Sequence, residues 1–126
     1  DVPLISNLDV WQNIALICQY HRNMPGKKAK AFVLQYLQRC GLENIGDKRT
    51  TFLSEEERFC VMLLRAAMLP DAVIVIDRPF KIMPYLKDTA FINETLIKID
   101  DLFTLCYIFD YVQEKDRYGM TDDTEN

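Results

Sequence analysis

The chain has 126 residues, 49% hydrophobic and 27% charged, which is typical of a single globular domain with a real core. Its net charge of −4 argues against a nucleic-acid-binding surface or an anionic-membrane surface, because both need basic residues. The four cysteines form no CxxC pair and only one histidine accompanies them, so the sequence predicts no metal site. Each cysteine has apolar neighbours, which favours reduced core thiols and a cytoplasmic location.

No apolar run approaches the roughly 18–20 residues that a membrane-spanning helix needs, and no signal peptide is recognised. Any contact with a membrane is therefore expected to be indirect, through a partner protein. The sequence opens with Asp1 rather than Met, which leaves open whether it was excised from a longer chain.

The first half of the sequence predicts two helices. Asp9 is a suitable N-cap for a helix over Val10–His21, whose apolar residues recur at helical spacing. A second helix is predicted over residues 27–40, and Gly41 is well placed as the residue that ends it. A polar connector, about 43–51, leads to the second half.

The second half is predicted to alternate between helices and apolar strands. In order, the expected elements are a helix from Ser54 to about Leu69, a strand Val73–Ile76, a loop 78–85 with two prolines, a helix Leu86–Ile99, a strand Phe103–Phe109 and a short helix Tyr111–Arg117.

Two apolar strands joined by a helix form a parallel unit, and we expect both strands to be buried. Two strands make an incomplete sheet, however, because its edges and faces need cover. The prediction is a helix-rich α/β fold in one domain, residues 1–120. It divides into a helical subdomain (4–52) and a part with the sheet (53–118), and 121–126 form a disordered acidic tail.

The stretch FLSEEERFCVMLLRAAMLPDAVIVIDRPF, residues 52–80, resembles the signature helix and Walker B strand of ABC transporter ATP-binding subunits. That family has LSGGQ or LSGGE, a helix with ARA, a hydrophobic strand and then Asp-Glu-Pro. Leu53-Ser54, Arg65-Ala66, Asp77 and Pro79 match it at the same spacing. The resemblance extends over about residues 4–118 and is closest to the ATPase of Mla-type phospholipid transporters. The resemblance implies a helical subdomain and part of a P-loop-NTPase-like parallel sheet.

The signature motif is altered. In the family, the serine and two glycines open a helix whose N–H groups face the γ-phosphate of ATP. Here Glu55 and Glu56 replace both glycines and add bulk and negative charge. Ser54 and Glu57 have the spacing of an S-x-x-E capping box. We therefore expect this helix to cap itself and to repel phosphate.

The positions that handle phosphate and water are altered as well. The resemblance implies that Asp77 matches the carboxylate that holds Mg²⁺, Arg78 the catalytic glutamate and Phe109 the switch histidine. A guanidinium cannot act as a general base, and a phenyl ring offers no hydrogen bond. We expect Asp77 to be structural and Arg78 to pair with it or with Glu55–Glu57. The sequence contains no GxxxxGK[ST] loop.

These observations lead to three hypotheses. The first is a non-catalytic ABC ATPase-like scaffold or interaction module that needs no cofactor and forms a homodimer or binds a transporter subunit. The second is the C-terminal half of an ATP-binding subunit, which binds ATP and Mg²⁺ weakly with a P-loop supplied by another segment or chain. The third is an unrelated small α/β or helical interaction domain.

Overall fold

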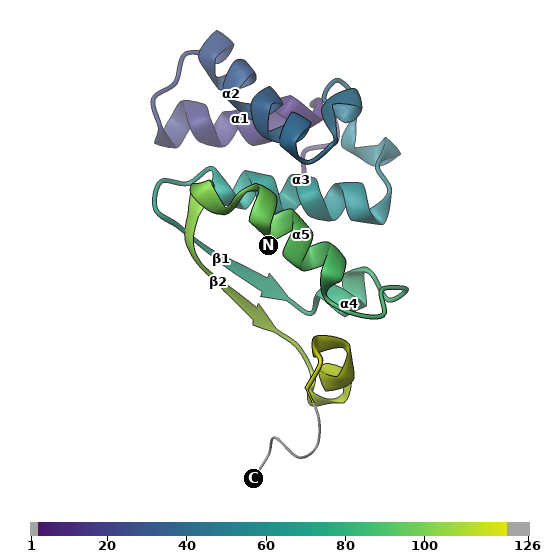
Figure 1. Ribbon diagram of the computed structural model, residues 1–126. Coiled ribbons are helices and arrows are strands. Elements are labelled where there is room, and N and C mark those ends of the chain that lie inside the picture. Colours follow the sequence, from purple (N-terminus) through teal and green to yellow (C-terminus); the bar gives the residue numbers. More distant parts are fainter. Residues whose placement is uncertain (1–2, 121–126) are drawn as a thin grey trace.

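The computed structural model describes residues 3–120, so the acidic tail expected at 121–126 lies outside the described residues. The molecule is built in layers (Figure 1). The helices α1 (Val10–His21) and α2 (Gly26–Arg39) form one layer, and α3 (Glu55–Ala67) separates them from a small sheet.

Helices α1 and α2 begin and end close to the predicted residues. The backbone N–H of Asp9 donates to the Gln12 side chain at 2.8 Å, which closes the first turn of α1. Gly41 follows α2 with a φ of 71°, a left-handed conformation that suits glycine at the end of a helix. The two helices pack on each other and enclose Val10, Ile14 and Leu37, which are fully buried.

Helix α3 is the centre of the core because it packs against α1 on one side and against the sheet on the other. A helix in this position must be apolar on more than one side. The buried side chains of α3 include Phe59, Cys60, Val61, Leu63, Leu64 and Ala67.

The sheet has two parallel strands, β1 (Ala72–Asp77) and β2 (Phe103–Phe109), joined through α5 (Ala90–Lys98). The register places Val73 beside Leu105, Val75 beside Tyr107 and Asp77 beside Phe109. The predicted fold class, a helix-rich α/β protein with an incomplete parallel sheet, is confirmed.

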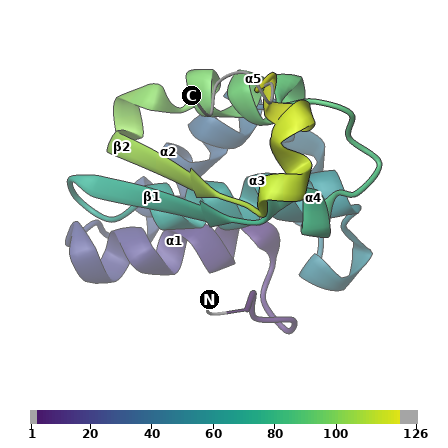
Figure 2. The ribbon, with the colours of Figure 1, turned by 90° about the horizontal axis from the view of Figure 1, so that it is seen from below.

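The helices cover only one face of this sheet. Figure 2 views the molecule from the side of the other face; there β1 lies in front of α3, and α5 lies beyond β2. In β1 the side chains alternate, so Ile74 and Ile76 are buried against the helices whereas Val73 and Val75 are exposed. The prediction of two buried strands is therefore wrong, since nothing in residues 3–120 forms a layer on the second face.

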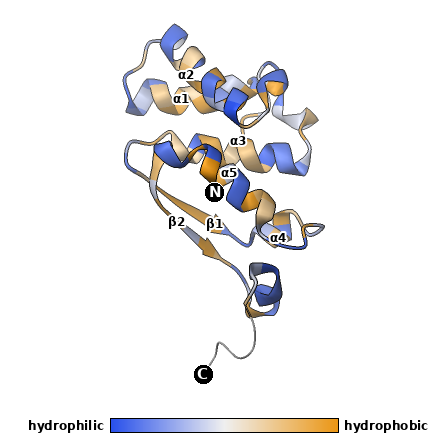
Figure 3. Cartoon of the chain, in the orientation of Figure 1, coloured by the Kyte–Doolittle hydropathy of each residue, from blue (hydrophilic) through white to orange (hydrophobic). Residues whose placement is uncertain are grey.

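We call this uncovered surface the outer face of the sheet. It consists of Val73, Val75, Leu105, Tyr107 and Phe109, whose side chains are 50 to 59% exposed. Because these residues are register neighbours on two adjacent strands, they form one continuous apolar patch. Both strands are hydrophobic along most of their length, which Figure 3 shows.

The segment between the strands differs from the prediction at two places. A one-turn helix, α4 (Pro79–Ile82), lies in the expected loop, because proline is well suited to the first position of a helix. Helix α5 begins at Ala90 rather than Leu86, and the Asp88 carboxylate accepts the Ala90 N–H at 3.0 Å. The short C-terminal helix, η4 (Val112–Tyr118), is present as a 3₁₀ helix.

Candidate functional site

The N-terminus of α3 is closed by its own side chains. The Ser54 hydroxyl accepts the Glu57 N–H at 3.2 Å, and the Ser54 N–H donates to the Glu57 carboxylate at 2.9 Å. The predicted capping box is therefore present, and it satisfies two of the N–H groups that a helix start leaves free.

The charge at this helix start is strongly negative. Glu55, Glu56 and Glu57 all lie in the first turn, where they are stabilised by the positive end of the helix dipole. Burial raises the pKa of Tyr85, in the loop after α4, and the carboxylates of Glu56 and Glu55 add to this effect. An anion approaching this helix end would meet three carboxylates.

Asp77, Arg78 and Phe109 come together at the carboxyl ends of the two strands. Asp77 and Phe109 are register partners, and the Arg78 N–H donates to the Phe109 carbonyl at 2.7 Å. Ligands of open α/β sheets commonly bind at this edge. The Phe109 side chain itself belongs to the outer face and is 57% exposed.

The Arg78 side chain is held by two neighbours. Its guanidinium lies 3.4 Å from the Asp77 carboxylate and donates to the Tyr111 hydroxyl at 3.0 Å. It also lies 5.6 Å from the centre of the Tyr111 ring. The hydrogen bond to Tyr111 and the charge of Asp77 raise the pKa of Arg78, so it stays protonated and cannot accept a proton from water.

Of the two pairings expected for Arg78, the structure has the one with Asp77. Tyr111, which makes the shorter contact, was missed from the sequence. The sequence contains little indication of this contact, because no motif relates a tyrosine two residues after a strand to an arginine 33 positions earlier.

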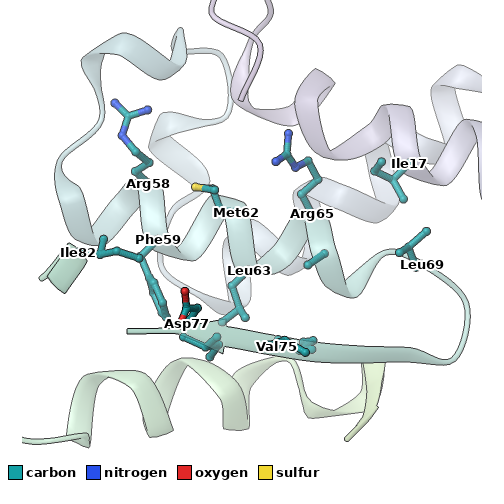
Figure 4. A pocket seen from close by; sticks show the side chains of 13 residues that line it. Ile17, Arg58, Phe59, Met62, Leu63, Arg65, Leu69, Val75, Asp77 and Ile82 are labelled. Atoms are coloured by element: carbon teal, nitrogen blue, oxygen red, sulfur yellow. The ribbon is translucent and has the colours of Figure 1, made fainter. Parts of the chain in front are cut away.

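A groove runs along the open edge of β1, with a volume of about 400 Å³ (Figure 4). The four consecutive residues 74–77 line it, although their side chains alternate between the two faces. The groove must therefore follow the strand edge, where backbone N–H and C=O groups of an edge strand are available. Its other wall is mainly apolar and includes Ile17, Phe59, Met62, Leu69 and Ile82.

Two arginines of α3 also line this groove and extend from the same side of the helix (Figure 4). Arg58 donates to the Thr50 carbonyl at 2.9 Å, and Arg65 donates to the Pro3 carbonyl at 3.1 Å. Burial lowers the pKa of Arg65. Asp77 lines the same groove, so the groove connects the strand ends with the helical part of the molecule.

Within residues 3–120, no group of three or more histidine, cysteine, aspartate or glutamate side chains is arranged to hold a metal ion. The four cysteines are free thiols; Cys18 and Cys60 are buried, and Cys40 and Cys106 are half-buried. Over the same residues, no helix is both long enough and apolar enough to cross a membrane.

No model of a known protein family matches the sequence, and no curated protein matches it. The link to ABC transporter ATP-binding subunits therefore depends on the motif spacing of residues 52–80, and it enters below as a proposal.

Proposed function

We propose that this chain is a non-catalytic relative of ABC transporter ATP-binding subunits, retained as a scaffold or interaction module associated with a transporter. The outer face of the sheet carries this proposal. Parallel sheets are normally covered on both faces, yet here five apolar side chains of one face are about half exposed. Apolar patches of this size commonly mark contacts with other proteins.

The non-catalytic part of the proposal is supported by the residues at the altered motif positions. The start of α3 is capped by Ser54 and Glu57 and is surrounded by acids, which disfavours a phosphate there. Arg78 is engaged by Asp77 and Tyr111 at the position of the family's general base. These contacts fit a region that has kept its packing without nucleotide chemistry.

The partner would be a second copy of the chain or a transporter subunit, and a membrane would be reached only through such a partner. The module would need no cofactor for this role.

Titration of the chain with ATP and Mg²⁺ in a calorimeter tests the non-catalytic part. We expect no measurable binding at millimolar ATP, whereas an intact ABC ATP-binding subunit measured alongside would bind. Binding at micromolar affinity by this chain alone would overturn the proposal.

The groove beside β1 favours a second candidate function. A strand added there by another segment or chain could bring a GxxxxGK[ST] loop, and the Asp77 carboxylate lines the same groove. The assembled unit would bind ATP and Mg²⁺ weakly, and with Arg78 in place of a general base it would hydrolyse ATP very slowly. The test is ATP binding by a mixture of this chain and a P-loop-bearing polypeptide, where neither alone binds.

A further inference from the structure

We propose that the outer face of the sheet binds the outer face of a second copy, so that two sheets pack face to face around a two-fold axis. This inference rests on the proposed function and names its partner and its surface. It also predicts which strand of one copy faces which strand of the other.

The area of the patch is in the range that a dimer needs. An aromatic side chain has about 150–250 Å² of surface, so the five half-exposed side chains together present roughly 400 Å². Tyr111 and Val112, which follow β2 after Asp110, are 54% and 72% exposed and add apolar surface near the carboxyl end of the strand. Two such surfaces in contact would bury about 1,000 Å², the lower bound for a specific interface.

The charge of the patch favours a second copy over a charged partner. The three register rows of the outer face contain one ionisable acid, Asp77, and Arg78 pairs with it. A surface without free charge is complementary to another apolar surface, and this chain itself provides one. A homodimer uses the same patch twice, so the apolar area of both copies is covered in one contact.

The sizes of the side chains determine the favoured arrangement. On the outer face β1 carries valines, whereas β2 carries leucine, tyrosine and phenylalanine. A two-fold axis parallel to the strands places β1 of each copy opposite β2 of the other. Small side chains then face large ones, which fills the space between two sheets that pack about 10 Å apart.

An axis perpendicular to the strands would instead place β1 opposite β1 and β2 opposite β2. The aromatic residues would then collide while the valines left a gap, so the parallel axis packs better.

The first test is the mass of the full chain in solution, by light scattering or sedimentation equilibrium at micromolar concentration. We expect twice the chain mass of 14.8 kDa. Tyr107→Glu places a carboxylate in the middle row of the patch and should weaken the dimer at least 100-fold. The matched control, Tyr20→Glu, changes an 81% exposed tyrosine of α1 and should leave the dimer intact.

The circular dichroism spectrum and melting temperature of Tyr107→Glu at low concentration establish that the variant is folded. A monomeric parent chain at 100 µM would overturn the inference and assign the patch to a different protein. An unaffected dimer in Tyr107→Glu, or equal loss in Tyr20→Glu, would overturn it too. None of these outcomes depends on ATP binding, so a failure of the dimer can be distinguished from a failure of the non-catalytic part of the proposed function.

The second test addresses the arrangement. Val75→Glu and Tyr107→Lys should each be monomeric alone, because each puts one charge into the apolar contact. A mixture of the two should form a heterodimer, since the introduced carboxylate of one chain faces the introduced ammonium of the other only if β1 lies opposite β2. A mixture that stays monomeric would overturn the parallel axis.

Discussion

Arg78 connects the carboxyl ends of the two strands through its backbone and its side chain. Its backbone is left-handed, with φ 49° and ψ 61°, which is unfavourable for any residue with a Cβ. This turn lets the chain leave β1 while the Arg78 N–H still binds the Phe109 carbonyl of β2. The side chain then lies against Tyr111 and Asp77, so both parts of the residue join the two strand ends.

The left-handed backbone leads to a comparison of two variants. Both Arg78→Gly and Arg78→Ala remove the contacts with Asp77 and Tyr111, but only glycine relieves the backbone strain. We expect Arg78→Gly to unfold several degrees above Arg78→Ala in a thermal melt followed by circular dichroism. Equal melting temperatures for the two variants would contradict a left-handed Arg78.

Among individual residues, the contacts that could be predicted from the sequence are those between residues close together in the chain. The Ser54–Glu57 pair was predictable because both partners lie within one helical turn and follow a known pattern. The contact of Arg78 with Tyr111 was not, because it depends on how two distant segments meet at the sheet edge.

Helix α2 is connected to the start of β2 by a small polar cluster. The Asp101 carboxylate accepts a hydrogen bond from the Tyr36 hydroxyl at 2.9 Å and one from the Arg39 guanidinium at 2.8 Å. Asp101 lies in the 3₁₀ turn η3 (Asp100–Leu102), immediately before β2. The cluster therefore fixes the helical layer against the element that leads into the second strand.

This cluster should make stability depend on pH. Burial would raise the pKa of Asp101, but Arg39 and Tyr36 outweigh burial and hold it below its usual value. A lowered pKa in the folded state stabilises the fold above about pH 4 and loses this effect as pH falls through the folded pKa. Asp101→Asn should lower the melting temperature by a few degrees at pH 7, and the difference should vanish in acid.

The control for this measurement is Asp47→Asn, which changes an exposed aspartate of the connector before α3. It should have little effect at either pH. A difference between Asp101→Asn and the parent chain that grew as the pH fell would contradict the assigned direction.

Elements were predicted with unequal success. The bounds of α1, α2 and β2 followed from caps and periodicity, which act over a few residues. The burial of the strands did not follow, because AVIVID and FTLCYIF look the same whether one face or both are covered. The prolines in residues 78–85 correctly indicated that strand β1 ends there. They also favoured a loop, so the one-turn helix α4 was not predicted.

In the molecule as a whole, helices cover one face of the sheet and leave the outer face exposed. The strand–helix–strand order was enough to predict parallel strands, since so few connections are allowed between two adjacent strands. Within residues 3–120 no layer covers the second face. The sequence did not reveal this, because an apolar strand can have the same residues whether one face or both are covered.

If a second copy supplies that layer, stability must depend on concentration. Association stabilises the folded chain by mass action, so the melting temperature should rise steadily between about 2 and 200 µM protein. Tyr107→Glu should melt at a temperature that does not change with concentration. A parent chain with a concentration-independent melting temperature would contradict the dimer as the source of the missing layer.

Strand β2 also has the features of an aggregation-prone segment, and the charged residues around it limit this tendency. Its seven residues are uncharged, contain neither proline nor glycine, and lie at an edge of the sheet, the features of a segment that initiates cross-β aggregation. Asp100 and Asp101 precede this segment and Asp110 follows it, so carboxylates stand at both ends as gatekeepers against stacking. That protection is electrostatic, so salt should weaken it by screening the carboxylates.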